Sequence, residues 1–291
     1  MLKANIGTFL ACDASYEEAG IVLYGAPFDS TTSYRPGTRF GSRAIRSESY
    51  GLESYSPYQD RDLTDYAVFD AGDQELCFGD ASLALKDLRE RAVEVAGDGK
   101  IPFMLGGEHL VTLAPVQALA EKYPDLHIIH FDAHADLRDD YLGAKLSHAC
   151  VLRRCWEVLG DGRITQFGIR SGDREEWRWG KEHVTTHPFI VDMEVLQETL
   201  RKLEGKPVYF TLDLDVLDPS VFPGTGTPEP GGISFEALRR AVTQICSAAW
   251  IVGCAVNELS PALDASGAST AVACKIVREM LLALLGNPKI K

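Results

Sequence analysis

Short, continuous runs of apolar residues alternate with longer amphipathic stretches along most of this chain. A strand that is apolar at every position is typical of a parallel sheet with helices on both faces, because neither of its faces meets water. Strands are therefore expected at residues 21–24, 66–69, 101–105, 126–131, 164–168, 189–191, 208–214 and 250–256. The amphipathic stretches predict helices at residues 81–96, 111–122, 147–159, 194–203, 234–247 and 269–285. This alternation predicts an α/β fold.

One domain is expected to span residues 1–291. No Pro/Ser-rich linker, repeat or low-complexity segment interrupts the alternation, and 45% of the residues are hydrophobic, which suits one substantial core. In parallel sheets of this kind, ligands bind beyond the carboxyl ends of the strands. The residues that close the predicted strands are therefore the candidates for a functional site.

Four of the predicted strands end in potential ligand groups. Strand 101–105 leads into GGEH, strand 126–131 leads into DAHAD, strand 208–214 ends in DLD, and strand 250–256 leads into NE. Six of these residues carry an imidazole or carboxylate suited to a metal: His109, Asp132, His134, Asp136, Asp213 and Asp215. Hard or borderline divalent metals prefer these ligands, and no cysteine accompanies them as in a closed structural zinc site. His127 and His130 lie within a strand and are expected to be structural.

The charge of this group sets the number of metal ions. Four carboxylates in one place would repel one another unless cations neutralised them. Their charge equals that of two divalent ions, and sites with two ions about 3.5–4 Å apart supply hydroxide at neutral pH. Taken singly, an Asp-x-Asp after a strand is often a turn or a helix cap. Complementary ligands at three strand ends favour a metal pair instead.

Several longer motifs resemble those of a known family. GGEHL, HFDAHADLRDDYLG followed by SHA, TLDLDVLDPS followed by FPGTGTPEPGG, and VNELSPALD resemble the signatures of the ureohydrolases, the arginases and agmatinases. GAPFDSTTSYRPGTRFGSRAIR and FGIRS resemble the agmatinase branch, and the similarity runs in order from about Gly25 to the C-terminal helix. It implies a three-layer α/β/α sandwich around an eight-stranded, mostly parallel sheet, and two Mn²⁺ ions per subunit. It also implies a homo-oligomer, commonly a trimer or hexamer.

The resemblance implies a role for each site residue. Asp132 and Asp213 would bridge both ions, His109 and Asp136 would complete the shell of one ion, and His134 and Asp215 would complete that of the other. Asp136 would relay a proton, His148 of SHA would be the mobile proton shuttle, and Glu258 of NELSP would receive the guanidinium in a charge-assisted pair. Many agmatinases have Gly-Thr where this chain has Ala149-Cys150, and the effect of that difference on His148 stays open.

The interval LRDDYLGAKLS, between DAHAD and His148, bears on the substrate. Its adjacent acids Asp139 and Asp140 would repel a carboxylate and attract an ammonium, which favours agmatine over arginine. Arg138 is the opposing feature, because its guanidinium could clamp a carboxylate. We therefore expect hydrolysis of agmatine, a small cationic guanidino substrate, to putrescine and urea. N1-aminopropylagmatine is the close alternative, and arginine and guanidinobutyrate are others of the same chemistry.

Two other classes of protein fit the same fold. A polyamine deacetylase shares the scaffold, but a glutamate that receives a guanidinium has no role in the removal of an acetyl group. A non-catalytic binding protein is expected to have lost metal ligands, whereas this chain has all six. Both are therefore less favoured than a ureohydrolase.

Composition limits the partners and the compartment. The formal net charge of −13 disfavours nucleic acid and anionic membrane surfaces as partners. No stretch approaches the roughly 18 apolar residues of a membrane span, and the N-terminal residues show no signal-peptide pattern. The seven scattered cysteines have no CxxC spacing, and five of them lie in apolar or helical surroundings, so buried free thiols are expected; Cys150 beside His148 is expected to be a buried, inert thiol. A reducing cytoplasm suits them.

Overall fold

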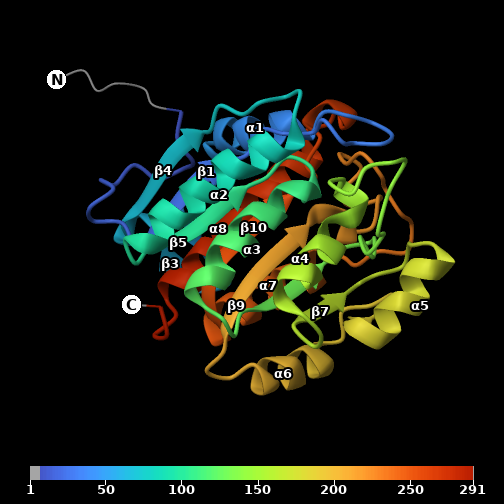
Figure 1. Ribbon diagram of the computed structural model, residues 1–291. Coiled ribbons are helices and arrows are strands. Elements are labelled where there is room, and N and C mark those ends of the chain that lie inside the picture. Colours follow the sequence, from blue (N-terminus) through green and yellow to red (C-terminus); the bar gives the residue numbers. More distant parts are fainter. Residues whose placement is uncertain (1–6, 291) are drawn as a thin grey trace.

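The computed structural model describes residues 7–290 and shows three layers, with helices on both sides of a sheet (Figure 1). Within that range, eight strands form the sheet in the order β4-β1-β5-β10-β9-β6-β7-β8, and all their pairings are parallel. They are β1 (Ile21–Gly25), β4 (Val68–Asp73), β5 (Ile101–Leu105), β6 (His127–Phe131), β7 (Ile164–Phe167), β8 (Thr185–His187), β9 (Pro207–Asp213) and β10 (Trp250–Asn257). A separate antiparallel hairpin consists of β2 (Tyr55–Ser56) and β3 (Arg61–Asp62). The predicted α/β/α fold is confirmed.

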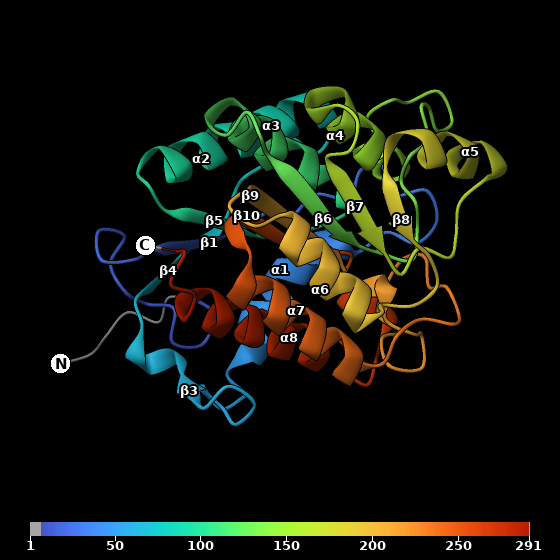
Figure 2. The same ribbon diagram turned by 90° about the horizontal axis from the view of Figure 1, so that it is seen from below.

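Four helices cover each face of the sheet, as Figure 2 shows. On one face lie α2 (Ala81–Gly97), α3 (Leu113–Lys122), α4 (Val151–Leu159) and α5 (Arg174–His183); on the other lie α1 (Gly41–Ser49), α6 (Met193–Lys202), α7 (Phe235–Ala248) and α8 (Ala268–Leu285). None of the helices within residues 7–290 is long and apolar enough to cross a membrane.

Each face of the sheet has its own apolar core. Consecutive strand residues point to opposite faces, so that Phe103 and Phe210 belong to the core under α7 and α8, while Met104 and Tyr209 belong to the core under α2 and α3. All four side chains are fully buried. Burial on both faces explains why these strands are apolar at every position.

The predicted strand at residues 189–191 is wrong. The last strand of the sheet is β8, and Phe189 and Ile190 follow it with 60% and 62% of their surface exposed. The backbone of Phe189 has a φ of 70°, and its N–H donates to the Ile169 carbonyl outside the strand ladder. The strand β8 lies at the edge of the sheet and pairs only with β7, so it does not need an apolar sequence, and its two β-branched threonines favour the extended conformation. The apolar residues that follow it form a turn.

Helices α1 and α5 were not predicted. Only Glu176 and Gly180 of α5 are buried, so its sequence has no apolar stripe to signal a helix. Its start is nevertheless marked by a capping box, in which Asp173 accepts from the backbone N–H of Glu176 and Glu176 accepts from that of Asp173. The helix ends at His183.

The four strands whose ends carry candidate ligands are neighbours. They are β5, β10, β9 and β6, which lie side by side in the middle of the sheet. Their ends are level, because Asn257 pairs with Asp213 and Val256 pairs with Leu105. Gly106 and Gly107 allow the chain to pass close to its neighbours, since a Cβ there would collide with Asn257 and with the Phe28 backbone. All candidate residues therefore project from one edge of the sheet.

Candidate active site

The structure brings all six predicted metal ligands together. The cluster of His109, Asp132, His134, Asp136, Asp213 and Asp215 lies at the carboxyl ends of the central strands, and all except His134 are buried. The His134 side chain is 23% exposed and is thus the member of the cluster that faces outward.

Within the cluster the ligand atoms form two groups. In the first, the Nδ1 atom of His109 lies 2.9 Å from Asp132 Oδ2, 3.2 Å from Asp136 Oδ2 and 3.5 Å from Asp213 Oδ2. In the second, the Nδ1 atom of His134 lies 3.4 Å from Asp132 Oδ1 and 2.9 Å from Asp215 Oδ2. Asp132 turns one oxygen to each group, which is the arrangement that a carboxylate shared by two ions requires.

The charges in this cluster call for cations. Burial and the Asp132 carboxylate raise the pKa of Asp136 to about 7, and burial together with Asp215 and Asp132 raises that of Asp213 well above its usual range. The buried Oδ2 oxygen of Asp215 faces His134 Nδ1 at 2.9 Å and accepts no other hydrogen bond from the described residues 7–290. Carboxylates that repel one another, with a buried oxygen turned to a histidine nitrogen, fit two divalent metal ions.

A network of hydroxyl groups orients His109. The Nε2 atom of His109 lies 2.9 Å from the Thr211 hydroxyl, which lies 3.0 Å from the Thr112 hydroxyl, and the Asn257 amide donates to both. With Nε2 bonded to Thr211, Nδ1 is left to face the carboxylates. Such a partner on the second ring nitrogen is usual for a metal-binding histidine, because it fixes the tautomer and the ring orientation.

His130 lies close to the cluster but is occupied by other contacts. Its Nδ1 atom accepts from the Gln166 amide at 3.0 Å, and the same amide also donates to the Ala135 carbonyl. The ring proton is therefore on Nε2, which donates to Asp132 Oδ2 at 2.8 Å. His130 thus orients a ligand and does not present a free nitrogen, in agreement with a structural role.

Two of the candidate catalytic residues have unusual backbone conformations. Asp136 has a φ of 53° and Glu258 a φ of 68°, in the left-handed region that residues with a side chain rarely adopt. Hydrogen bonds hold both in place: the Asp136 carbonyl accepts from the N–H groups of Leu152 and Arg153, and the Glu258 N–H donates to the Gly107 carbonyl. Strain of this kind persists where the surrounding structure enforces it, typically at functional sites.

Glu258 is buried next to the cluster. Its Oε1 atom accepts from the backbone N–H of His109 at 2.8 Å. Burial, the neighbouring Glu108 and Asp215 raise the pKa of Glu258 well above its usual range. A carboxylate in this environment gains from a cationic partner such as a guanidinium.

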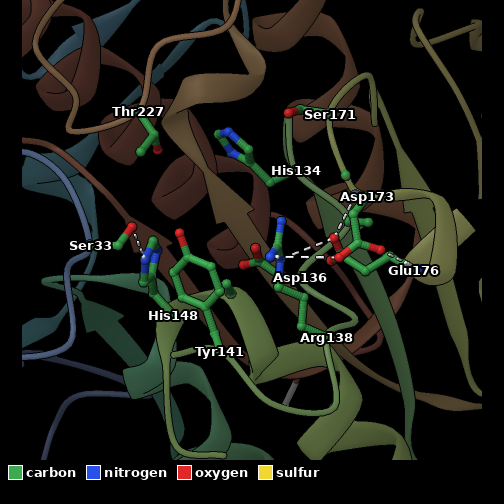
Figure 3. A pocket seen from close by; sticks show the side chains of 13 residues that line it. Ser33, His134, Asp136, Arg138, Tyr141, His148, Ser171, Asp173, Glu176 and Thr227 are labelled. Carbon is green, nitrogen blue, oxygen red and sulfur yellow. Dashed lines mark hydrogen bonds and ion pairs between the residues drawn. The ribbon is translucent and has the colours of Figure 1, made fainter. Parts of the chain in front are cut away.

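A cavity of about 410 Å³ opens on the outer side of the cluster. Among the side chains that line it are His134, Asp136 and His148, together with Ser33, Arg138, Tyr141, Ser171, Asp173, Glu176 and Thr227 (Figure 3). His148 points into the cavity beside Ser33 and Tyr141, and Ala149 also lines it. Cys150 is not among the lining residues: its thiol is buried, which raises its pKa to about 12 and makes it unreactive.

The acidic residues of the cavity are not those that were expected. Asp139 pairs with Arg154 at 2.7 Å, Asp140 accepts from the Gly143 backbone, and neither lines the cavity beside His134 and Asp136. Asp173 and Glu176, at the start of α5, line it instead. Asp139 and Asp140 line a neighbouring cavity, which shares Arg138, Asp173 and Glu176 with this one. Asp173 and Glu176 form the capping box of α5, and this pattern was the signal in the sequence that could have identified them.

Arg138 lies between this acidic pair and an aromatic ring. Its Nε atom is 3.2 Å from Glu176, its Nη1 atom is 3.6 Å from Asp173, and its guanidinium lies 4.6 Å from the centre of the Tyr141 ring (Figure 3). Two carboxylates and one guanidinium leave this part of the cavity with one net negative charge. The guanidinium is thus already paired and is poorly placed to act as a free clamp for a carboxylate.

Asp218, which follows the DLD motif, stabilises a loop. One of its oxygens accepts from the N–H and hydroxyl of Ser220, and the other accepts from the N–H groups of Gly231 and Gly232. The hydrogen bonds from Ser220 and these glycines lower the pKa of Asp218 to about 2. Asp218 therefore links the two ends of the loop that contains Thr227, one of the residues that line the cavity.

Comparisons with known proteins identify the family of this chain. The family model described as "Arginase family" matches residues 19–283. The agmatinase of Bacillus subtilis (strain 168) is 48% identical over 275 residues, which cover 94% of this chain and 95% of that protein. The N(1)-aminopropylagmatine ureohydrolase of Thermococcus kodakarensis is 37% identical, and the match covers 84% of each chain.

A solved structure is similar to this chain in both fold and sequence. The crystal structure of a putative agmatinase from Clostridium difficile superimposes with a TM-score of 0.90 at 47% identity, and the match covers 93% of this chain and 99% of that one. The family model covers most of the chain, and the solved relative shares its fold. This chain belongs to the arginase family.

Proposed function

We propose that this protein is an agmatinase-type ureohydrolase that hydrolyses agmatine to putrescine and urea at a pair of manganese ions. The two ligand groups that share Asp132, with Glu258 beside them, carry this proposal. The named agmatinases among the relatives support the choice of substrate. The family to which the chain belongs supports manganese as the metal.

The six residues of the cluster would hold the two ions. His109 and Asp136 would serve one ion, His134 and Asp215 the other, and Asp132 and Asp213 both. When bound, two divalent ions lower the pKa of water and so supply a hydroxide nucleophile at neutral pH.

Residues of the chain itself handle the substrate and its protons. The guanidinium carbon is a poor electrophile because resonance spreads its charge, so it must be held in place for attack. The Glu258 carboxylate binds the guanidinium, and Asp136 accepts the proton that the nucleophile loses. The tetrahedral carbon then collapses when the leaving amine gains a proton, which the His148 imidazole supplies; His148 regains a proton as Asp136 gives up the one it accepted, through solvent in the cavity. Urea and the free amine are the products.

The charges farther along the cavity support a cationic tail. Asp173 and Glu176 attract the ammonium of agmatine, whereas the carboxylate of arginine would face both of them. Arg138 is held by the same two acids and by Tyr141 and so leaves their net charge negative. The longer polyamine N1-aminopropylagmatine satisfies the same electrostatics, and a relative that acts on it is among the similar proteins.

We further propose that the protein is one domain that works in the cytoplasm as a homo-oligomer, a trimer or hexamer. Its seven free cysteines, six of them buried, support a reducing compartment. The resemblance to the family supports the oligomer.

A comparison of substrates tests the proposed function. Manganese-loaded protein is offered agmatine, arginine, guanidinobutyrate and N1-aminopropylagmatine, and the release of urea is measured for each. We expect kcat/KM for agmatine to exceed that for arginine by about 10²-fold, as buried like charges in the tail region would repel the carboxylate. Preference for the longer polyamine would keep the chemistry and change the substrate. A preference for arginine, or no urea from any of the four, would contradict the proposal.

A further inference from the structure

A buried glutamate outside the metal cluster organises one wall of the cavity. Glu108 is fully buried and follows Gly107 at the end of β5. One carboxylate oxygen accepts from the Thr31 hydroxyl at 2.6 Å, the other from the Thr32 hydroxyl at 2.9 Å, and the Thr31 backbone N–H donates to both. Glu108 also donates its own N–H to the Phe28 carbonyl. The segment 28–32 is thereby bound to the sheet edge by several hydrogen bonds to one residue.

This segment contacts His148 at two points. The Thr31 hydroxyl, which donates to Glu108, accepts from the backbone N–H of His148 at 3.1 Å. Two residues later, the Ser33 hydroxyl lies 3.0 Å from Nε2 of the His148 ring (Figure 3). The backbone and the imidazole of His148 are thus both held by the segment that Glu108 binds, although 115 residues separate Ser33 from His148 in the chain.

We propose that Ser33 and Glu108 are positioning residues for His148: Ser33 holds its imidazole through Nε2, and Glu108 holds the segment from which Ser33 projects. This inference rests on the proposed function in that His148 is taken to carry the proton. Neither residue is one of the six metal ligands.

A hydroxyl is a suitable partner for a group that gains and loses a proton. The Ser33 hydroxyl accepts a hydrogen bond from the protonated ring and donates one to the neutral ring, so it favours neither charge state. A carboxylate in its place would favour the cation and hold the proton back. Tyr141 meets the same ring edge-on at a centroid distance of 6.2 Å and adds no charge. The ring is therefore oriented while its protonation stays free to change.

Substitutions at Ser33 test the contact with the ring. Ser33→Ala is expected to lower kcat for agmatine about tenfold, the effect of one hydrogen bond on a proton-transfer group, with KM changed less than about twofold. Ser33→Thr keeps a hydroxyl and should recover most of the loss. Both variants should still bind two manganese ions per chain. An unchanged kcat in Ser33→Ala would overturn the proposal.

A double-mutant cycle separates positioning from general damage to the site. In a His148→Ala background, where no imidazole is left to orient, Ser33→Ala should change kcat by less than about twofold. The same tenfold loss in that background would show that Ser33 acts on something other than His148, and the proposal would be wrong.

Two substitutions of Thr31 test the contact between Glu108 and the segment 28–32. Thr31→Val has the same shape and keeps the backbone N–H, but it loses the hydroxyl that donates to Glu108 and accepts from the His148 N–H, whereas Thr31→Ser keeps that hydroxyl. We expect Thr31→Val to lower kcat as Ser33→Ala does, and Thr31→Ser to lower it much less. Equal effects of the two substitutions would contradict a role for the hydroxyl.

A chemical readout keeps this test independent of the proposed activity. The rate at which diethyl pyrocarbonate modifies His148 is followed by peptide mass spectrometry in manganese-loaded protein. Loss of the hydrogen bond frees the ring, so Ser33→Ala and Thr31→Val should raise the rate about threefold or more, and Thr31→Ser should not. If no variant releases urea but this difference is found, the proposed function fails and the positioning stands. If urea is released but the rates are equal, the positioning is wrong.

Discussion

Asp132→Asn should abolish the release of urea and leave at most one firmly bound metal ion per chain. Among the described residues 7–290, Asp132 is the only carboxylate that faces both His109 and His134 with separate oxygens, at 2.9 Å and 3.4 Å. An amide is neutral and offers a single oxygen, so it cannot serve both groups. Because the nucleophile depends on the pair of ions, we expect activity to fall about 10³-fold or more. Metal content by elemental analysis and urea release measure the two effects.

Asp139→Asn is the matched control for this substitution. Asp139 lies seven positions later in the same segment, pairs with Arg154 and does not line the cavity beside His134 and Asp136. The Asp139→Asn protein should bind two ions per chain and have a kcat within about twofold of that of the unchanged protein. An Asp132→Asn protein with two bound ions and full activity would contradict the assignment of Asp132.

Glu258→Gln should lower kcat/KM for agmatine roughly 10²- to 10³-fold while both metal ions stay bound. The loss corresponds to about 3–4 kcal/mol, the size expected when a buried charge loses its partner. Glutamine keeps the length of the side chain and can still accept from the His109 N–H, so the change is confined to the charge. Kinetics over a range of agmatine concentrations measures the effect.

The exposed Glu90 on α2 provides the control for this change. It pairs with Lys86 at 3.8 Å on the surface, and Glu90→Gln should leave kcat/KM unchanged. If Glu258→Gln behaved like this control, Glu258 would not be the group that receives the guanidinium.

The location of the site was predictable because the fold class fixes which edge of the sheet binds ligands. Continuous apolar strands predicted a parallel sheet, and the polar residues that end four of those strands had to meet at its carboxyl edge. The structure places β5, β10, β9 and β6 side by side, so this inference holds for the residues that follow them. That Asp132 faces both histidines, in contrast, is a matter of side-chain geometry that no spacing in the sequence specifies.

Features that depend on contacts between distant segments could not be predicted from the sequence. Asp173 and Glu176 look like the start of a polar helix, and only the packing of α5 beside Arg138 brings them into the cavity. Glu108 looks like a loop residue, and its function follows from contacts with Thr31 and Thr32, 77 and 76 positions away. Asp139 and Asp140 were misleading for the same reason, since Asp139 pairs with Arg154, Asp140 accepts from the Gly143 backbone, and both line a neighbouring cavity instead.

Anomalous diffraction at the manganese edge, from crystals of the manganese-loaded protein, tests the central claim most directly. Two peaks are predicted at the carboxyl edge of the sheet, one bonded to His109 Nδ1 and Asp136, the other to His134 Nδ1 and Asp215, with Asp132 touching both. A single peak, or peaks bonded to other residues, would contradict a binuclear centre built from this cluster.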